Sequence, residues 1–102
     1  MSERHYSEAI AFYNKAIALD PDDPFPYYNK AMAYGALERY EDALIATDKA
    51  LKRAPDRAII HNIKAMALFA LGKYEEALAA VDKAVSLDTS HNEPQHLRER
   101  II

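Results

Sequence analysis

Cysteine is absent from this 102-residue chain, and so is tryptophan. Without cysteine the chain has no disulfide bond, no thiolate nucleophile and no thiolate metal site, so its stability must come from packing. No apolar stretch approaches the roughly 20 residues that a membrane-spanning helix needs, and the N-terminus has no signal region of basic and then apolar residues. We therefore expect a cytoplasmic protein.

Excess positive charge and turn-forming residues are also scarce. The formal net charge is -3, whereas a protein that binds the phosphate backbone of nucleic acid needs a concentrated excess of lysine and arginine. Only two glycines and five prolines interrupt a chain that is 50% hydrophobic and 28% charged. With its many Ala, Leu, Glu and Lys residues, this composition predicts an all-α fold with short turns and no nucleic-acid or membrane partner.

What the chain does contain is an internal repeat. Tyr6, Tyr40 and Tyr74 are separated by 34 residues, and the string Lys-Ala-Met-Ala occurs at residues 30–33 and again at residues 64–67. The chain holds three such periods. A repeat of this length is typical of an array in which similar units stack on one another.

Each period is expected to contain two amphipathic helices. Between residues 40 and 53 the apolar residues recur with the spacing of one helix face, and the opposite face is charged. Proline and aspartate separate successive helices at residues 20–24 and 54–56, and Ser90 followed by Glu93 has the spacing of a capping box. We predict six helices, at residues 4–19, 24–37, 40–53, 58–71, 74–87 and 92–102.

The order of aromatic, small and proline residues within the period carries a family resemblance. In the central repeat these residues are Tyr27, Ala31, Tyr34, Tyr40, Ala43, Ala50 and Pro55. The pattern resembles the tetratricopeptide repeat in a prokaryotic-type array. The resemblance implies an α-solenoid of antiparallel helix pairs in one domain, with a half repeat at residues 1–21 (second helix only), full repeats at 24–55 and 58–89, and a truncated first helix at 92–102.

A few positions depart from the family pattern. Thr47 and Val81 stand where an aromatic residue is usual, Glu38 where glycine is usual, Thr89 where proline is usual, and Lys30 and Lys64 where leucine is commoner. We expect these departures to weaken local packing and turn closure. They leave the fold assignment unchanged.

The resemblance also implies a function, namely a scaffold that binds a peptide or helix of a partner protein in its concave groove, without chemistry or a cofactor of its own. Uncharged stripes on the first helix of each pair supply the expected partner-binding residues: Phe25, Tyr28, Asn29, Met32, Ile59, Asn62, Met66 and Phe69, together with Gly35. Relatives that clamp the C-terminal carboxylate of heat-shock chaperones need lysine and arginine on these stripes. Tyr28, Met32, Ile59 and Ile63 occupy the positions here, which argues against a carboxylate clamp.

Other interpretations stay open at this stage. Any one of Phe25, Tyr28, Met66 and Phe69 is equally well explained as a packing residue between repeats. The array is alternatively a structural spacer or a self-association element, in which the last helix of one chain completes the first half repeat of another to give a homo-oligomer. No metal or catalytic site is expected, because the four histidines lack a zinc-binding pattern and the paired acidic residues at helix starts complement the helix dipole.

Overall fold

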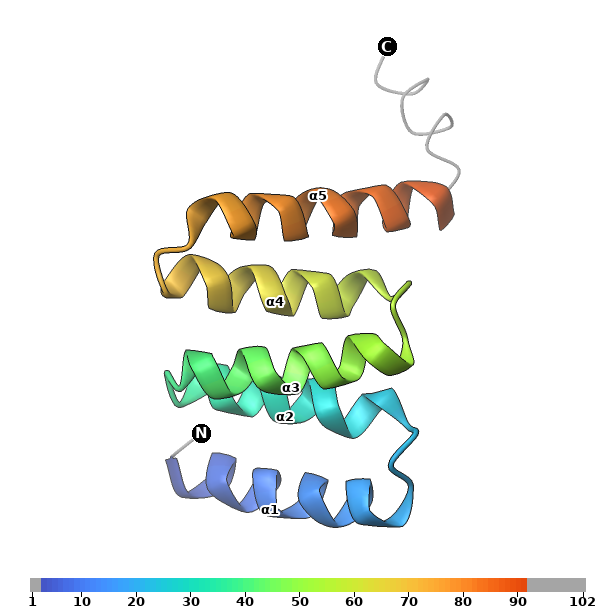
Figure 1. Ribbon diagram of the computed structural model, residues 1–102. Coiled ribbons are helices and arrows are strands. Elements are labelled where there is room, and N and C mark those ends of the chain that lie inside the picture. Colours follow the sequence, from blue (N-terminus) through green and yellow to red (C-terminus); the bar gives the residue numbers. More distant parts are fainter. Residues whose placement is uncertain (1–2, 92–102) are drawn as a thin grey trace, which may run out of the picture.

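The structure, a computed structural model, describes residues 3–91 as α-helices joined by short turns, with each helix antiparallel to the next (Figure 1). In chain order these helices are α1 (Glu3–Leu19), α2 (Pro24–Ala36), α3 (Tyr40–Arg53), α4 (Ala58–Ala70) and α5 (Tyr74–His91). None of these described helices is both long and apolar enough to cross a membrane. The all-α solenoid expected from the sequence is confirmed.

The first four helices agree with the sequence-based prediction to within one residue at each end. The predicted end of the fifth helix at residue 87 is wrong, because α5 continues to His91. In the preceding repeat, α3 ends just before Pro55, which cannot continue a helix. Thr89 stands one period after Pro55 and does not stop α5, so Ser90 lies within α5 and does not have the predicted capping role. The predicted helix at residues 92–102 lies outside the described residues.

Each helix packs on its neighbours in the chain, as in a one-dimensional stack. α2 lies against α1 and α3, α4 lies against α3 and α5, and α2 also touches α4. Small residues make the close approach possible, since Ala31, Ala43 and Ala50 are at most 1% exposed. Packing against neighbours supplies the stability that an isolated helix pair lacks.

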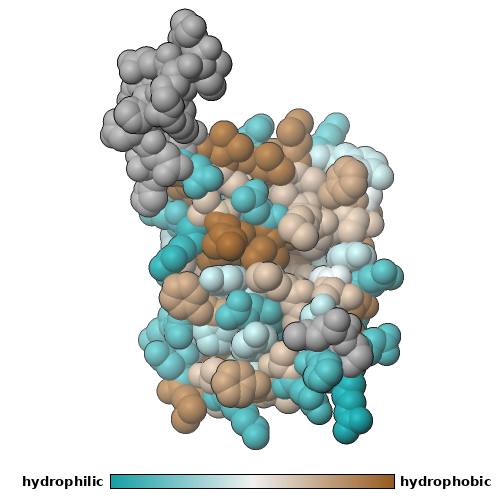
Figure 2. Space-filling view, turned by 180° about the vertical axis from the view of Figure 1, so that it is seen from behind, coloured by the Kyte–Doolittle hydropathy of each residue, from teal (hydrophilic) through white to brown (hydrophobic). Residues whose placement is uncertain are grey.

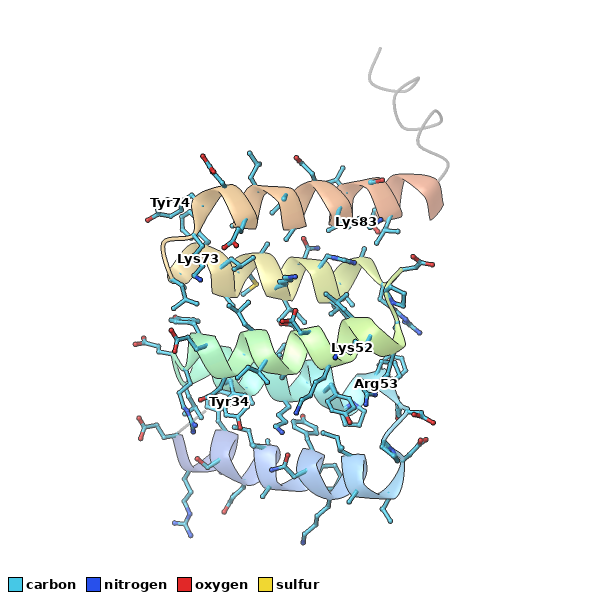
Figure 3. The ribbon with its side chains drawn as sticks, in the orientation of Figure 1. Tyr34, Lys52, Arg53, Lys73, Tyr74 and Lys83 are labelled. Atoms are coloured by element: carbon cyan, nitrogen blue, oxygen red, sulfur yellow. The ribbon has the colours of Figure 1, made fainter. Side chains whose placement is uncertain are left out.

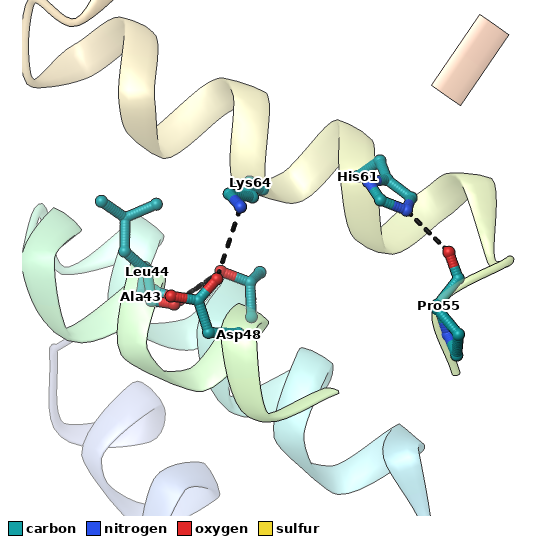
Figure 4. A network of polar contacts seen from close by, with 7 residues as sticks. Ala43, Leu44, Asp48, Pro55, His61 and Lys64 are labelled. Atoms are coloured by element: carbon teal, nitrogen blue, oxygen red, sulfur yellow. Dashed lines mark hydrogen bonds and ion pairs between the residues drawn. The ribbon is translucent and has the colours of Figure 1, made fainter. Parts of the chain in front are cut away.

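Two repeats differ from the family pattern at the position of Thr47, and the structure shows how the smaller residue is accommodated. The side chain is fully buried, and its hydroxyl lies 2.9 Å from the carbonyl oxygen of Ala43 and 3.0 Å from that of Leu44 (Figure 4). The hydroxyl therefore donates within its own helix. Burial costs little when a polar group keeps such a partner.

Polar contacts also tie α4 to the preceding segment. Lys64 Nζ lies 3.5 Å from Asp48 Oδ1 on α3, and His61 Nε2 lies 2.8 Å from the carbonyl oxygen of Pro55 (Figure 4). The imidazole of His61 thus has a structural partner.

The turns that close the two complete helix pairs share one geometry. After α2, Glu38 has φ of 61° and the amide of Arg39 donates to the carbonyl of Tyr34 at 2.8 Å; after α4, Gly72 has φ of 81° and the amide of Lys73 donates to that of Leu68 at 2.9 Å. Both turns place one residue in the left-handed region, which suits glycine because it lacks a Cβ atom. Glu38 adopts the same conformation with a side chain.

Arg53 fastens the end of α3 to the turn between α1 and α2. Its Nε donates to the carbonyl oxygen of Pro21 at 2.6 Å, its Nη1 donates to that of Lys49 at 2.7 Å, and its guanidinium lies 4.3 Å from the ring centroid of Tyr27. Figure 3 shows Arg53 near the right-hand ends of the helices, and Tyr34 and Tyr74 near the left-hand ends. The helices are therefore fixed in register at their ends as well as along their seams.

Candidate functional site

An apolar groove of about 1110 Å³ runs across α2, α4 and the first half of α5. Figure 2 shows apolar side chains gathered on the back of the molecule, over its upper helices. The floor is made of buried alanines, among them Ala31 on α2, Ala67 on α4 and Ala77 on α5. None of the described residues that line the groove is charged, and Asn62 contributes a side-chain amide group to the lining.

Large, flexible side chains rise from this floor. Met32 is 51% exposed, Met66 is 69% exposed and Phe69 is 64% exposed, and all three line the groove. Met32 lies on α2, and Met66 and Phe69 lie on α4. These two helices are the first helices of successive repeats. Methionine adapts to differently shaped partners because its side chain is unbranched and polarizable. An exposed apolar groove of this kind is typical of a surface that binds a protein segment.

The structure brings together part of the predicted partner-binding set. Met32, Asn62, Met66 and Phe69 line one groove, and so does Gly35. Since these residues lie on two helices that the 34-residue period relates, the periodic stripe is a good guide to the middle and C-terminal parts of α2 and α4. That these residues bind a partner remains a prediction.

The other four predicted residues lie outside the groove, in the N-terminal halves of the same helices. The Phe25 and Tyr28 rings pack edge to face with their centroids 5.5 Å apart, and the guanidinium of Arg57 lies 4.8 Å from the Phe25 ring. Tyr28 also packs against buried residues of the core. Asn29 is half-buried and Ile59 is exposed. Packing against core residues of neighbouring helices agrees with the alternative that the sequence left open for Tyr28. Phe25 is 39% exposed, and that it binds a partner stays a prediction.

Sequence reasoning missed the contribution of α5. Tyr74, Leu78 and Val81, which we call the α5 face, line the groove and are 62%, 62% and 38% exposed. Tyr74 stands one period after Tyr40, which packs against the core, but the ring of Tyr74 is largely exposed and contacts Phe69 edge to face at 5.1 Å. The apolar spacing along α5 was a usable signal.

Positive charge is held away from the groove. Lys30 is half-buried, and this burial, followed by the nearby Lys49, lowers the pKa of its ammonium group, while Asp42 acts in the opposite direction. Lys64 faces Asp48. Neither lysine lines the groove, so the groove offers no cation to an acidic ligand. Within residues 3–91, no three His, Cys, Asp or Glu side chains are grouped so that they could hold a metal ion.

Several solved structures share this arrangement of helices. The second TPR of Spaghetti (RPAP3) bound to the HSP90 peptide SRMEEVD is 28% identical, with a TM-score of 0.78 over 80% of this chain and 76% of that one. The TPR2B domain of yeast Sti1 in its pHsp70 complex is also 28% identical, with a TM-score of 0.84 over 94% of this chain and 77% of that one. MamA from AMB-1 is 25% identical with a TM-score of 0.80, and this chain spans about half of it, 52%.

Comparison of the sequence with family models agrees with the structural likeness. Among curated proteins, none is similar enough in sequence to count as a relative. A model described as tetratricopeptide repeat matches residues 28–92, and one described as TPR repeat matches residues 5–38. The first match alone covers more than half of the chain, and the period, turns and helix pairs described above agree with it. The chain belongs to the tetratricopeptide-repeat family.

Proposed function

We propose that this chain is a scaffold that binds an amphipathic helix of a partner protein in the groove formed by α2, α4 and the α5 face. The observation that carries the proposal is a continuous apolar groove without a charged lining residue among those described. On this proposal the chain binds its partner and does no chemistry itself. We also propose that it works in the cytoplasm, which a fluorescent fusion would test.

Two structural neighbours support a peptide ligand in general. The second TPR of Spaghetti (RPAP3) is bound to the HSP90 peptide SRMEEVD, and the TPR2B domain of yeast Sti1 is in complex with pHsp70. The first of these peptides is rich in acidic residues, whereas the groove described here presents Met32, Met66 and Phe69. Apolar side chains gain affinity from burying apolar surface and gain little from a carboxylate. A helix with apolar residues at positions i, i+3, i+4 and i+7 therefore suits this groove better than an acidic tail.

Binding of labelled peptides, followed by fluorescence polarisation, tests this proposal. The probes are amphipathic helical peptides selected from a display library on the wild-type chain, and the peptide SRMEEVD serves as the acidic comparison. We expect Met66→Glu to weaken the selected peptides at least tenfold, because a carboxylate in the apolar groove costs free energy in the complex. SRMEEVD should not bind measurably.

A matched control separates the groove from a general loss of apolar surface. Ile45 is 56% exposed on α3 and does not line the groove, so Ile45→Glu should leave peptide affinity unchanged. Circular dichroism establishes that each variant remains helical. Equal weakening by Met66→Glu and Ile45→Glu, or tight binding of SRMEEVD, would contradict a groove that selects apolar helices.

The second candidate function is self-association, and the exposure of the α5 face favours it. A contiguous apolar surface on one helix is a common site of contact between copies of a chain. In the general form of this hypothesis, another copy of the chain fills the groove or packs against an open end of the stack. Groove variants would then change the assembly state of the pure protein without any heterologous partner.

A further inference from the structure

The α5 face is the wall of the groove at one end of the stack, and the preceding repeat shows what covers the same positions there. Leu78 and Val81 correspond to Leu44 and Thr47 on α3. Thr47 is fully buried and Leu44 packs against two core clusters, whereas Val81 is 38% exposed and Leu78 is 62% exposed. The difference arises because α4 lies against α3, while no helix within residues 3–91 lies on the far side of α5 (Figure 1). The α5 face thus has the residue pattern of a contact between two helices.

Negative charge is concentrated on α5. This helix carries four acidic residues and one lysine, whereas α3 carries three acidic and three basic residues. Two of the acidic residues, Glu75 and Asp82, are exposed, and the helical period places them beside Leu78, on the edge of the α5 face that points away from α4. They are seven residues apart, which is about 10 Å along the helix. Neither carboxylate forms an ion pair within residues 3–91. The uncharged groove therefore has an acidic edge.

The contact between α3 and α4 shows which kind of helix fits beside such residues. α4 covers α3 with three buried residues that pack with alanines of α3, namely Ile60, Ile63 and Ala67. Lys64, which follows Ile63, reaches across the contact, and its ammonium lies 3.5 Å from Asp48 (Figure 4). Asp82 stands one period after Asp48. A helix that lay on α5 as α4 lies on α3 would therefore bring its residues i, i+3 and i+7 to the α5 face and its residue i+4 to Asp82.

We propose that the partner helix is basic: it lies along the α5 face in the place that α4 takes on α3, and it carries lysine or arginine opposite Asp82 and Glu75. This inference rests on the proposed function, because it specifies the ligand of the same groove. The partner helix runs antiparallel to α5, as α4 runs antiparallel to α3 (Figure 1). One cation stands at i+4, opposite Asp82, and the other at i+11, opposite Glu75, because the two carboxylates are seven residues apart. Met66 and Phe69, which line the same groove, contact the other side of the partner helix.

Charge favours a basic partner over a second copy of the chain. The formal net charge of the chain is -3, and two α5 helices packed antiparallel would bring Glu75 of one copy near Asp82 of the other. Like charges placed together across an interface are unfavourable, whereas opposite charges attract the partner from a distance and fix its register. The described part of the same chain does not return over the α5 face either. Residues 88–91 stand one period after the turn at residues 54–57, but they continue the helix of α5.

Fluorescence polarisation with labelled helical peptides tests the charge of the partner. Two peptides carry isoleucine at i and i+3 and alanine at i+7; the basic peptide has lysine at i+4 and i+11, and the acidic peptide has glutamate at both positions. We expect the wild-type chain to bind the basic peptide at least tenfold more tightly, with a preference that falls as the salt concentration rises. Asp82→Lys should weaken binding of the basic peptide about fivefold. A third peptide, with glutamate at i+4 and lysine at i+11, should bind this variant more tightly than the basic peptide does, which a misfolded variant could not achieve.

Glu76→Lys is the matched control for Asp82→Lys. It makes the same change in net charge on the same helix, and the helical period places the exposed Glu76 on the side of α5 opposite the α5 face. This variant should keep the full preference for the basic peptide. Equal affinity of the wild-type chain for the basic and acidic peptides overturns the inference, and so does an equal effect of Asp82→Lys and Glu76→Lys.

Two other occupants of the α5 face would also overturn the inference. A wild-type dimer that Leu78→Asp dissociates, as measured by analytical ultracentrifugation, would assign the face to a second copy. Leu97 stands one period after Ile63, so binding of the basic peptide that appears only in a Leu97→Asp variant would assign the face to residues 92–102 of the same chain. The groove proposal is tested separately by Met66→Glu. Equal binding of the basic and acidic peptides, both weakened by Met66→Glu, would refute the charge of the partner and leave the groove in place.

Discussion

Glu38 holds a conformation that disfavours any residue with a Cβ atom, and replacing it with glycine should stabilise the fold. Its φ of 61° lies in the left-handed region, which costs a non-glycine residue about 1–2 kcal/mol. Glycine in the unfolded chain has more conformational freedom to lose, which offsets about 0.5–1 kcal/mol of that gain. We expect Glu38→Gly to raise the free energy of unfolding by about 0.5–1 kcal/mol.

The same chain offers the reverse experiment at an equivalent position. Gly72 closes the α4–α5 turn with φ of 81°, and a Cβ atom there would meet no heavy atom within 4 Å. Gly72→Ala therefore creates backbone strain without a steric clash. We expect it to lower the free energy of unfolding by about 1 kcal/mol. The two substitutions change stability in opposite directions for one physical reason.

Thermal and urea unfolding followed by circular dichroism measure both effects. For a domain of this size, 1 kcal/mol corresponds to roughly 4–8 °C in Tm. Glu38→Ala is the control, since it removes the carboxylate but keeps the Cβ atom, and it should leave Tm nearly unchanged. If Glu38→Ala stabilises the chain as much as Glu38→Gly, the gain comes from the lost charge and the argument from backbone strain is refuted.

Three further substitutions test other contacts by the same unfolding measurements. Lys30→Met should stabilise the fold at neutral pH, because the lowered pKa of Lys30 means that its charged form is disfavoured in the folded state. This gain in stability should shrink as the pH rises toward the ordinary lysine pKa of about 10.4. A gain that does not change with pH would exclude charge as the cause. Arg53→Ala should lower the free energy of unfolding by about 1 kcal/mol, since two hydrogen bonds to carbonyl oxygens and the contact with the Tyr27 ring are lost. An unchanged Tm would show that contacts with solvent replace these interactions fully. Thr47→Val should change stability by less than about 1 kcal/mol, because both carbonyl groups that accept from its hydroxyl lie within a helix. Thr47→Ala should cost more, because it opens a cavity. An equal loss of stability in both variants would show that the hydroxyl matters more than the side-chain volume.

Periodicity made most of the fold predictable from the sequence. Tyr6, Tyr40 and Tyr74 fix the period, and proline and aspartate between the helices fix where α2 and α4 begin. Helix boundaries depend mainly on residues that are close by in the sequence, so the sequence predicts them well. The close packing of Ala31 and Ala43 follows from the same pattern, since small residues recur where two helices meet.

The candidate site was only partly predictable, because exposure depends on which helix lies against which. The stripe on α2 and α4 predicts Met32 and Met66 in the groove, and the structure places both there. The same stripe cannot distinguish Tyr28, which packs into the core, from Met32 one helical turn later. Tyr74 shows the converse: its period predicts burial, but a residue at a seam is buried only if a second helix covers it.

The shared geometry of the turns after α2 and α4 has a consequence for how the length of the array is set. Because each turn meets the next helix in the same way, the segment from Pro24 to Arg57 acts as an interchangeable unit. Inserting a second copy of it between Arg57 and Ala58 should extend the groove by one unit and leave the flanking helices in place. The length of partner helix that such a protein can hold is thus counted in whole 34-residue units, and evolution can lengthen the binding surface by duplication without redesigning a single seam.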